Sequence, residues 1–88
     1  GVYAVTVSGP GFENAHGVAN VGTRPTVNDS IKANLEVHLL DWDKNLYGIT
    51  IEVTFCTKLR DEQKFDSIEE LKTNINNDIV RAHDWFSQ

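Results

Sequence analysis

The sequence has one cysteine, two prolines and no methionine among its 88 residues, and it has no long apolar run. A single cysteine excludes an intramolecular disulfide and suits a reducing cytoplasm, where we expect this protein. No apolar run is long enough for a transmembrane helix, and we expect no membrane partner. Basic residues are scarce: 8 against 13 acidic residues give a formal charge of −5. This balance argues against a nucleic-acid partner, because such proteins carry basic patches.

The residues that are present are typical of one small globular domain, which we predict to span residues 1–88. Hydrophobic residues make up 40% of the chain and charged residues 24%. A domain of this size buries a modest core, so marginal stability is expected. Cys56 stands in an apolar strand pattern, which predicts a buried small hydrophobe rather than a reactive thiol.

Four segments favour β-strands, because they are rich in strand-forming residues or alternate in polarity; they are residues 2–7, 16–22, 35–41 and 49–55. Alternation gives residues 35–41 an apolar face made of Leu35, Val37 and Leu39. The opposite face is made of Glu36, His38 and Leu40. The most regular segment has an apolar face made of Ile49, Ile51, Val53 and Phe55. The intervening segments predict an irregular loop at 23–30, in which Pro25 keeps Arg24 extended, and a turn at 43–45.

The last third of the chain changes to a helical period. Apolar residues recur at steps of three and four, namely Ile68, Leu71, Ile75, Ile79 and Ala82. Ser67 and Glu70 form a capping box, which predicts the start of the helix. Trp85 and Phe86 are expected to pack its end onto the sheet. Four or more antiparallel strands followed by one helix predict a mostly β fold, a small twisted barrel with a carboxy-terminal α-helix across it.

Three stretches are hard to explain by packing alone. Residues 19–26 end a strand with a turn that could offer backbone N–H groups and Arg24 to an anion. These residues alone favour the alternative, a loop whose polar groups satisfy only its own backbone. Glu36 lies mid-strand, where a partly buried carboxylate could act as a general base. Here too the pattern alone favours a solvent-facing side chain, and His38 is no different.

The third stretch, residues 58–66, joins the most regular strand to the helix and is crowded with charge. Such a connection either carries binding residues on a rigid frame or is a solvated link, and composition does not separate the two. Several common ligand-binding motifs are missing from the sequence. The sequence has no glycine-rich phosphate loop, no dinucleotide fingerprint and no paired Cys/His spacing for a metal.

Taken together, six segments are similar in order and spacing to bacterial riboflavin kinase modules. They read GVYAV at 1–5, VANVGTRPT at 18–26, LEVHLLD at 35–41, LYG at 46–48, KLR at 58–60, and FDS at 65–67 followed by the helix. Over nearly its whole length the chain resembles the carboxy-terminal riboflavin kinase module of bacterial FAD synthetases.

The resemblance implies a six-stranded Greek-key barrel with a terminal helix. It also implies transfer of the γ-phosphate of ATP, bound with Mg²⁺, to the 5′-hydroxyl of riboflavin, giving FMN. Glu36 falls on the catalytic carboxylate that takes the hydroxyl proton, Arg60 falls in a flavin-contacting loop, and Phe65 braces that loop. The other implied site residues are His38, Asp41 and Leu46 on the nucleotide side, and Asn20, Thr23 and Arg24 bordering the pocket.

In the family, a glycine-containing loop and a Pro-Thr-Ala-Asn motif precede the Gly-Val-Tyr strand and hold Mg²⁺ and the ATP phosphates. The sequence begins at Gly1, after both, so the first barrel strand is expected to be missing and no metal ligand is assigned to it. We therefore expect these 88 residues alone to be a very poor kinase, as an assay with riboflavin, ATP and Mg²⁺ would show. The expected partners are an upstream adenylyltransferase domain and, through an exposed barrel edge, a second copy of the chain.

Other functions stay open at this point. A barrel of this kind could bind flavin or serve assembly without transferring phosphate. If the chain were an unrelated β-barrel adaptor, the similarity of all six segments to riboflavin kinase modules would have to be accidental. An oligonucleotide-binding barrel is disfavoured by the acidic charge and by the lack of interleaved aromatic and basic residues.

Overall fold

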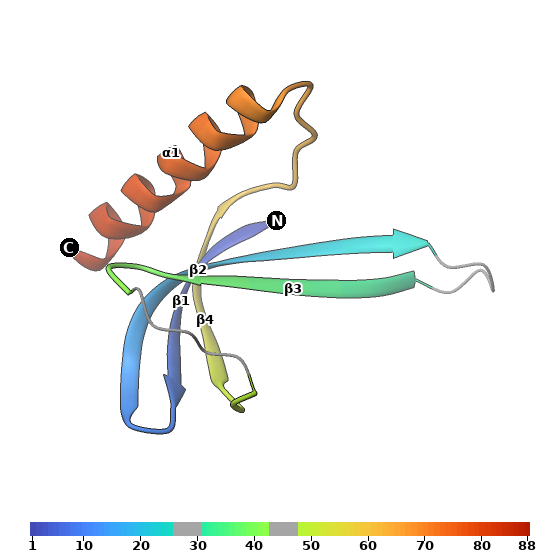
Figure 1. Cartoon of the computed structure of the whole chain (residues 1–88). Coiled ribbons are helices and arrows are strands. Elements are labelled where there is room, and N and C mark those ends of the chain that lie inside the picture. Colours follow the sequence, from blue (N-terminus) through green and yellow to red (C-terminus); the bar gives the residue numbers. More distant parts are fainter. Residues whose placement is uncertain (26–30, 43–47) are drawn as a thin grey trace.

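The computed structural model describes residues 1–25, 31–42 and 48–88, and for residues 23–25 and 31–34 it describes the backbone alone. Four strands precede one helix (Figure 1); they are β1 Val2–Gly9, β2 Phe12–Pro25, β3 Ile31–Leu39, β4 Glu52–Arg60 and α1 Ile68–Phe86. The strands form one antiparallel sheet in the order β3-β2-β1-β4. Because the fourth strand returns beside the first, this is a Greek key. The predicted fold class, mostly β with a carboxy-terminal helix, is confirmed.

The sheet is open and resembles part of a barrel, whereas the resemblance implied a closed six-stranded one. Closing the sheet into a barrel requires more strands than the four found among the described residues. In the sheet that these four form, β3 and β4 are the outer strands. Strand β1 pairs with β2 as far as Asn20, and backbone hydrogen bonds between Gly1 and Val21 extend this pairing by one residue. The rest of β2 pairs with β3 alone among these strands, and this hairpin extends beyond the sheet (Figure 1).

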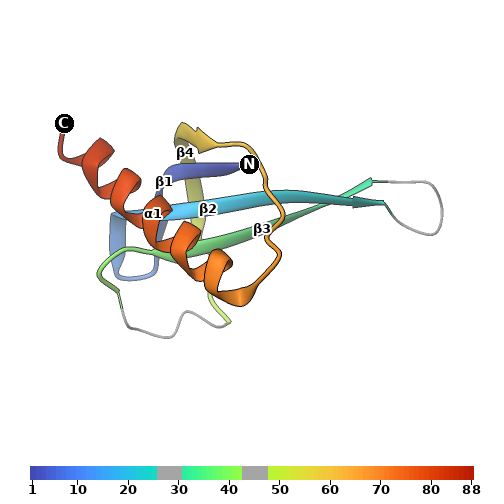
Figure 2. The ribbon, with the colours of Figure 1, turned by 90° about the horizontal axis from the view of Figure 1, so that it is seen from above.

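Strand β1 lies at the centre of the sheet and contributes buried side chains to both faces. One face forms the helix-side cluster, whose buried members are Val2, Ala4, Val18, Leu40 and Ala82. The opposite face forms the outer cluster, whose buried members are Val5, Val7, Ala19 and Leu39. Helix α1 lies across the sheet over the helix-side cluster (Figure 2), and Trp85 and Phe86 pack there as predicted.

The boundaries of β2 and β3 differ from the predicted ones. Part of the predicted loop at 23–30 belongs to β2, which continues to Pro25 and pairs with the start of β3 at Ile31. Proline is tolerated there because this end of β2 pairs with β3 alone among the described strands and is therefore an edge. Strand β3 ends at Leu39, earlier than predicted, since Asp41 adopts a left-handed turn conformation with φ of 56°. Residues 26–30 and the predicted turn at 43–45 lie outside the described residues.

Strand β4 begins at Glu52, three residues later than predicted, and ends at Arg60. Its register with β1 skips Cys56 and Leu59, which marks two β-bulges that interrupt the simple alternation of faces. The prediction that Cys56 is buried is wrong, because its thiol is exposed at a bulge on an outer strand. Bulges of this kind are common at sheet edges, where they bend the strand.

Helix α1 begins where the capping box predicted. The Ser67 hydroxyl accepts a hydrogen bond of 3.1 Å from the Glu70 backbone N–H, and the Glu70 carboxylate accepts one of 3.4 Å from the Asp66 N–H. The packing of the helix is uneven, because Ala82 is fully buried whereas Ile68 is 71% exposed. The amino half accordingly diverges from the sheet (Figure 1). In the described ranges, no helix is both long and apolar enough to cross a membrane.

Candidate functional site

A cleft of about 450 Å³ lies between the helix side of the sheet and the amino half of α1. One wall carries polar side chains from β2 and β3, namely Asn20, Glu36 and His38. The opposite wall carries apolar side chains from α1, namely Leu71, Ile75 and Ile79. Arg60 and Phe65 lie at the connection between sheet and helix. A cleft with one apolar and one polar wall suits a ligand that has a flat apolar part and a hydrogen-bonding part.

The strand register explains why the polar side chains meet. Residues directly opposite in an antiparallel pair lie on the same face of the sheet. Glu36 is opposite Asn20, and His38 is opposite Val18 of the helix-side cluster. Glu36 and His38 therefore share one face, as the predicted alternation required, and the structure shows that this face is the one toward α1. Glu36 is exposed rather than partly buried, so its carboxylate is open to the cleft and accessible to a ligand.

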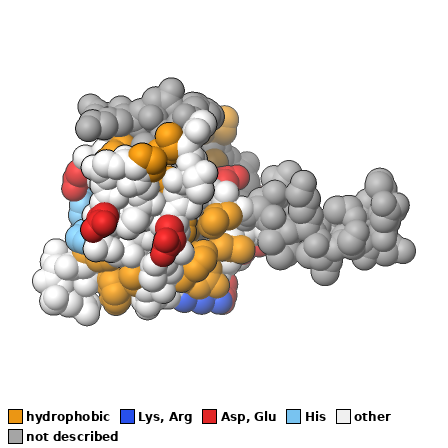
Figure 3. Space-filling model, turned by 90° about the horizontal axis from the view of Figure 1, so that it is seen from below, with side chains coloured by type: hydrophobic (Ala, Val, Ile, Leu, Met, Phe, Trp, Pro, Cys, Tyr) orange, Lys and Arg blue, Asp and Glu red, His pale blue; other side chains and the backbone are white. Residues whose placement is uncertain are grey.

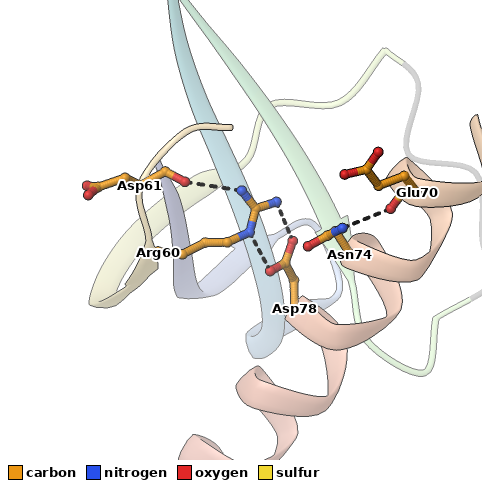
Figure 4. Close-up of polar contacts among 5 residues, drawn as sticks. All are labelled: Arg60, Asp61, Glu70, Asn74 and Asp78. Carbon is orange, nitrogen blue, oxygen red and sulfur yellow. Dashed lines mark hydrogen bonds and ion pairs between the residues drawn. The ribbon is translucent and has the colours of Figure 1, made fainter. Parts of the chain in front are cut away.

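Arg60, the last residue of β4, is bound to Asp78 in the middle of α1. Its Nε donates to one carboxylate oxygen at 2.7 Å and its Nη2 to the other at 2.8 Å (Figure 4). Both side chains are largely shielded from water, at 17% exposed for Arg60 and 7% for Asp78. The hydrogen bonds that Arg60 donates to the Asp78 carboxylate raise the pKa of Arg60 further, so the guanidinium stays charged. The pair ties the helix to the end of the sheet.

The residues after Arg60 form an end wall of the cleft. The guanidinium carbon of Arg60 lies 5.6 Å from the centre of the Phe65 ring, a cation–π arrangement. Glu62 lies against β2 at Gly22, where an added Cβ would come within 2.9 Å of a Glu62 carboxylate oxygen. Gly22 therefore lets this segment approach the strand closely.

An exposed ion pair lies at the start of this wall. Lys58 Nζ lies 2.5 Å from the Asp61 carboxylate. The hydrogen bond from Lys58, helped by the attraction of the two charges, lowers the pKa of Asp61. The same bond raises the pKa of Lys58. Because both side chains are exposed to water, the pair adds little to stability.

Five of the sequence-predicted site residues line this one cleft; they are Asn20, Glu36, His38, Arg60 and Phe65. Leu46 lies outside the described residues. Thr23 and Arg24 belong to β2, and only their backbone is described. The roles assigned to all of these residues remain predictions.

Asp41 lies away from the cleft, near the carboxyl end of α1. Its carboxylate is 3.9 Å from His83 Nε2, and it borders a second cleft of about 320 Å³ that is also lined by His16 and Trp42. The assignment of Asp41 to the nucleotide side therefore concerns a different part of the surface from that of His38.

Asp78 is a cleft residue that the sequence analysis missed. It follows Ile75 by three residues and precedes Ala82 by four, so it lies on the apolar face of the helix. A carboxylate on such a face indicates a partner of opposite charge, since charged groups are rarely buried without one. The sequence did not indicate that the partner is Arg60, 18 positions earlier.

The part of the chain that the structure describes contains no group of three His, Cys, Asp or Glu side chains that could hold a metal ion. Among the described residues, the cleft therefore offers no site that would hold a metal ion through three such side chains, although Mg²⁺ usually takes only one or two carboxylates together with substrate phosphates. No chemical step through a protein-bound metal is derived for them.

Comparison with known proteins gives consistent matches. A family model described as riboflavin kinase (flavokinase) matches residues 1–86. A bifunctional riboflavin kinase/FMN adenylyltransferase of Haemophilus influenzae is 47% identical over 87 residues, which cover 99% of this chain and 28% of that protein. A protein of the same name from Escherichia coli K12 is 51% identical over 86 residues, which cover 98% of this chain and 27% of the relative. The chain thus spans little more than a quarter of the length of these relatives.

A solved structure shares the fold. The crystal structure of a macrolide-efflux protein from Streptococcus pneumoniae is 30% identical to this chain, with a TM-score of 0.87. The match covers 97% of this chain and 27% of that one. The arrangement of four strands and one helix therefore also occurs within a longer chain.

Proposed function

Because this chain belongs to the riboflavin kinase family, we propose that it is the riboflavin kinase module of a bifunctional riboflavin kinase/FMN adenylyltransferase. In this reaction the γ-phosphoryl group of ATP passes to the ribityl 5′-hydroxyl of riboflavin, and FMN and ADP are released. The observation that carries the proposal is a single cleft in which Glu36, Arg60 and an apolar face of α1 meet.

Glu36 is proposed as the general base. Phosphoryl transfer depends mainly on an oriented nucleophile and on stabilisation of charge, with little covalent help from the protein. A carboxylate that faces an open cleft is able to orient the 5′-hydroxyl and accept its proton. The apolar wall from α1 suits the flavin ring, with Arg60 and Phe65 at the same end, and Asn20 borders the hydroxylated tail.

ATP is the second proposed substrate, with His38 and Leu46 on its side of the site. Asp41, which the resemblance also assigned to the nucleotide, borders the second cleft instead. Mg²⁺ prefers oxygen ligands that include substrate phosphates, so we expect it to arrive with the nucleotide. The adenylyltransferase named in the relatives is proposed as the partner domain, because this chain matches only the kinase part of their length.

An exchange experiment tests the proposed activity. The chain replaces the matching segment of the bifunctional protein of Escherichia coli, and the formation of FMN from riboflavin and ATP is measured. We expect kinase activity of the same order as that of the parent, with FMN adenylyltransferase activity of the same chimera as the control for intact folding. A chimera that adenylylates FMN and binds riboflavin without phosphorylating it would instead favour a flavin-binding or assembly domain.

Self-association is proposed for the 88-residue chain. Among the described strands, β3 and β4 are the outer ones, and outer edges readily pair with other strands. Hydrophobic side chains also reach the surface beside acidic ones (Figure 3), and Leu35 and Phe55 are about half exposed. In size-exclusion chromatography with light scattering, the apparent mass is expected to rise with concentration from the monomer mass of 9.9 kDa. A constant monomer mass at every concentration would contradict pairing of these edges.

A further inference from the structure

Asp78 marks a boundary within α1. After it, Ala82 is fully buried and Trp85 packs on the helix-side cluster. Before it, Ile75 is 44% exposed and Leu71 is 40% exposed. Asp78, taken as a whole residue, is only 5% exposed. It therefore lies where the anchored half of the helix passes into the half that overhangs the cleft.

The contacts of Asp78 fix the orientation of Arg60. Both carboxylate oxygens are engaged by the planar guanidinium fork, which is the most directional form of ion pair. The remaining edge of the guanidinium donates from Nη1 to the Asp61 carbonyl at 3.1 Å (Figure 4). The guanidinium carbon also lies over the Phe65 ring, 5.6 Å from its centre, so Arg60 has partners on several sides. Asp78 thus determines where the guanidinium lies at the end of the cleft.

The same pair also holds the overhanging half of α1. The apolar side chains of that half are too exposed to anchor it through buried area. A bidentate pair to the last residue of β4 supplies the missing constraint, because it joins the middle of the helix to the rigid sheet. The distance between the two walls of the cleft depends on this connection.

We propose that Asp78 is a positioning residue, which acts through Arg60 to hold the amino half of α1 over the cleft and so to set the shape of the flavin site. The identification of flavin as the ligand rests on the proposed function. The effect of Asp78 on the position of α1 does not depend on that function, and it is measured without any ligand.

The test compares Asp78→Asn with the wild-type chain by two measurements. Hydrogen exchange of backbone amides is expected to become about tenfold faster in residues 68–77 and to stay unchanged in residues 79–86. The tenfold change corresponds to the loss of one charge-assisted hydrogen bond. The dissociation constant for riboflavin, from the quenching of flavin fluorescence, is expected to rise by about the same factor. Asp84→Asn, the same change at an exposed position of the same helix, is the control and is expected to alter neither value.

Two further variants keep the proposal testable if Asp78→Asn fails to fold. Asp78→Glu keeps the charge and is expected to recover most of the protection and affinity, whereas Arg60→Lys keeps the charge but loses the fork and is expected to lose both. A purely structural role would speed exchange evenly along the chain and leave the riboflavin constant unchanged, which would overturn the proposal. If the wild-type chain does not bind riboflavin, the proposed function is in error, and the exchange pattern alone still decides the role of Asp78.

Discussion

Replacing Glu36 by glutamine in the chimera is expected to lower kcat for FMN formation by about 10²- to 10⁴-fold, the usual contribution of a general base. Glutamine keeps the size and the hydrogen-bonding reach of glutamate but does not accept the hydroxyl proton. Because Glu36 is exposed in the cleft, the change leaves the core intact. The dissociation constant for riboflavin is therefore expected to stay nearly unchanged, as fluorescence titration would measure.

The matched control is Glu52→Gln, which makes the same change at an exposed position at the opposite end of β4 from Arg60. It is expected to leave kcat unchanged, and the FMN adenylyltransferase activity of each chimera reports on folding. If Glu36→Gln retained the kcat of the parent, Glu36 would not be the base. If riboflavin affinity fell together with kcat, Glu36 would act mainly in binding.

The polar wall of the cleft could be predicted from the sequence because it depends on a single local rule. Side chains alternate between the faces of a strand, so Glu36 and His38 had to share one face and Leu39 the other. The start of α1 followed from an equally local signal, the capping box at Ser67. Predictions of this kind require no knowledge of which strands are neighbours.

The features that were not predicted depend on such neighbours. The exposure of Cys56 results from a bulge in the register between β1 and β4, which the sequence of β4 alone does not reveal. The burial of Asp78 depends on a partner from the end of β4. Arg60 was assigned to the flavin through the resemblance, and its engagement by Asp78 became apparent only from the fold. Long-range pairing, rather than local propensity, thus sets the geometry at the end of the cleft.

Replacing Arg60 by methionine is expected to lower the free energy of unfolding by about 3 kcal/mol, because it leaves the carboxylate of Asp78 shielded from water without its counter-charge. For a domain of this size that is a large share of the total, which is about 5–10 kcal/mol. Urea denaturation followed by circular dichroism measures the change, and the slope of the transition shows whether the unfolding remains two-state.

Two comparisons separate the unpaired charge from the loss of packing. Lys58→Met makes the same substitution at the exposed pair with Asp61 on the same strand, and it is expected to have little effect. The double variant Arg60→Met, Asp78→Leu removes both charges, so it is expected to recover most of the stability that Arg60→Met loses, because no charge is left unpaired. If the double variant were as unstable as Arg60→Met alone, the loss would come from packing around the arginine stem. Recovery of stability without recovery of riboflavin affinity would show that the ion pair serves the cleft more than it serves the fold.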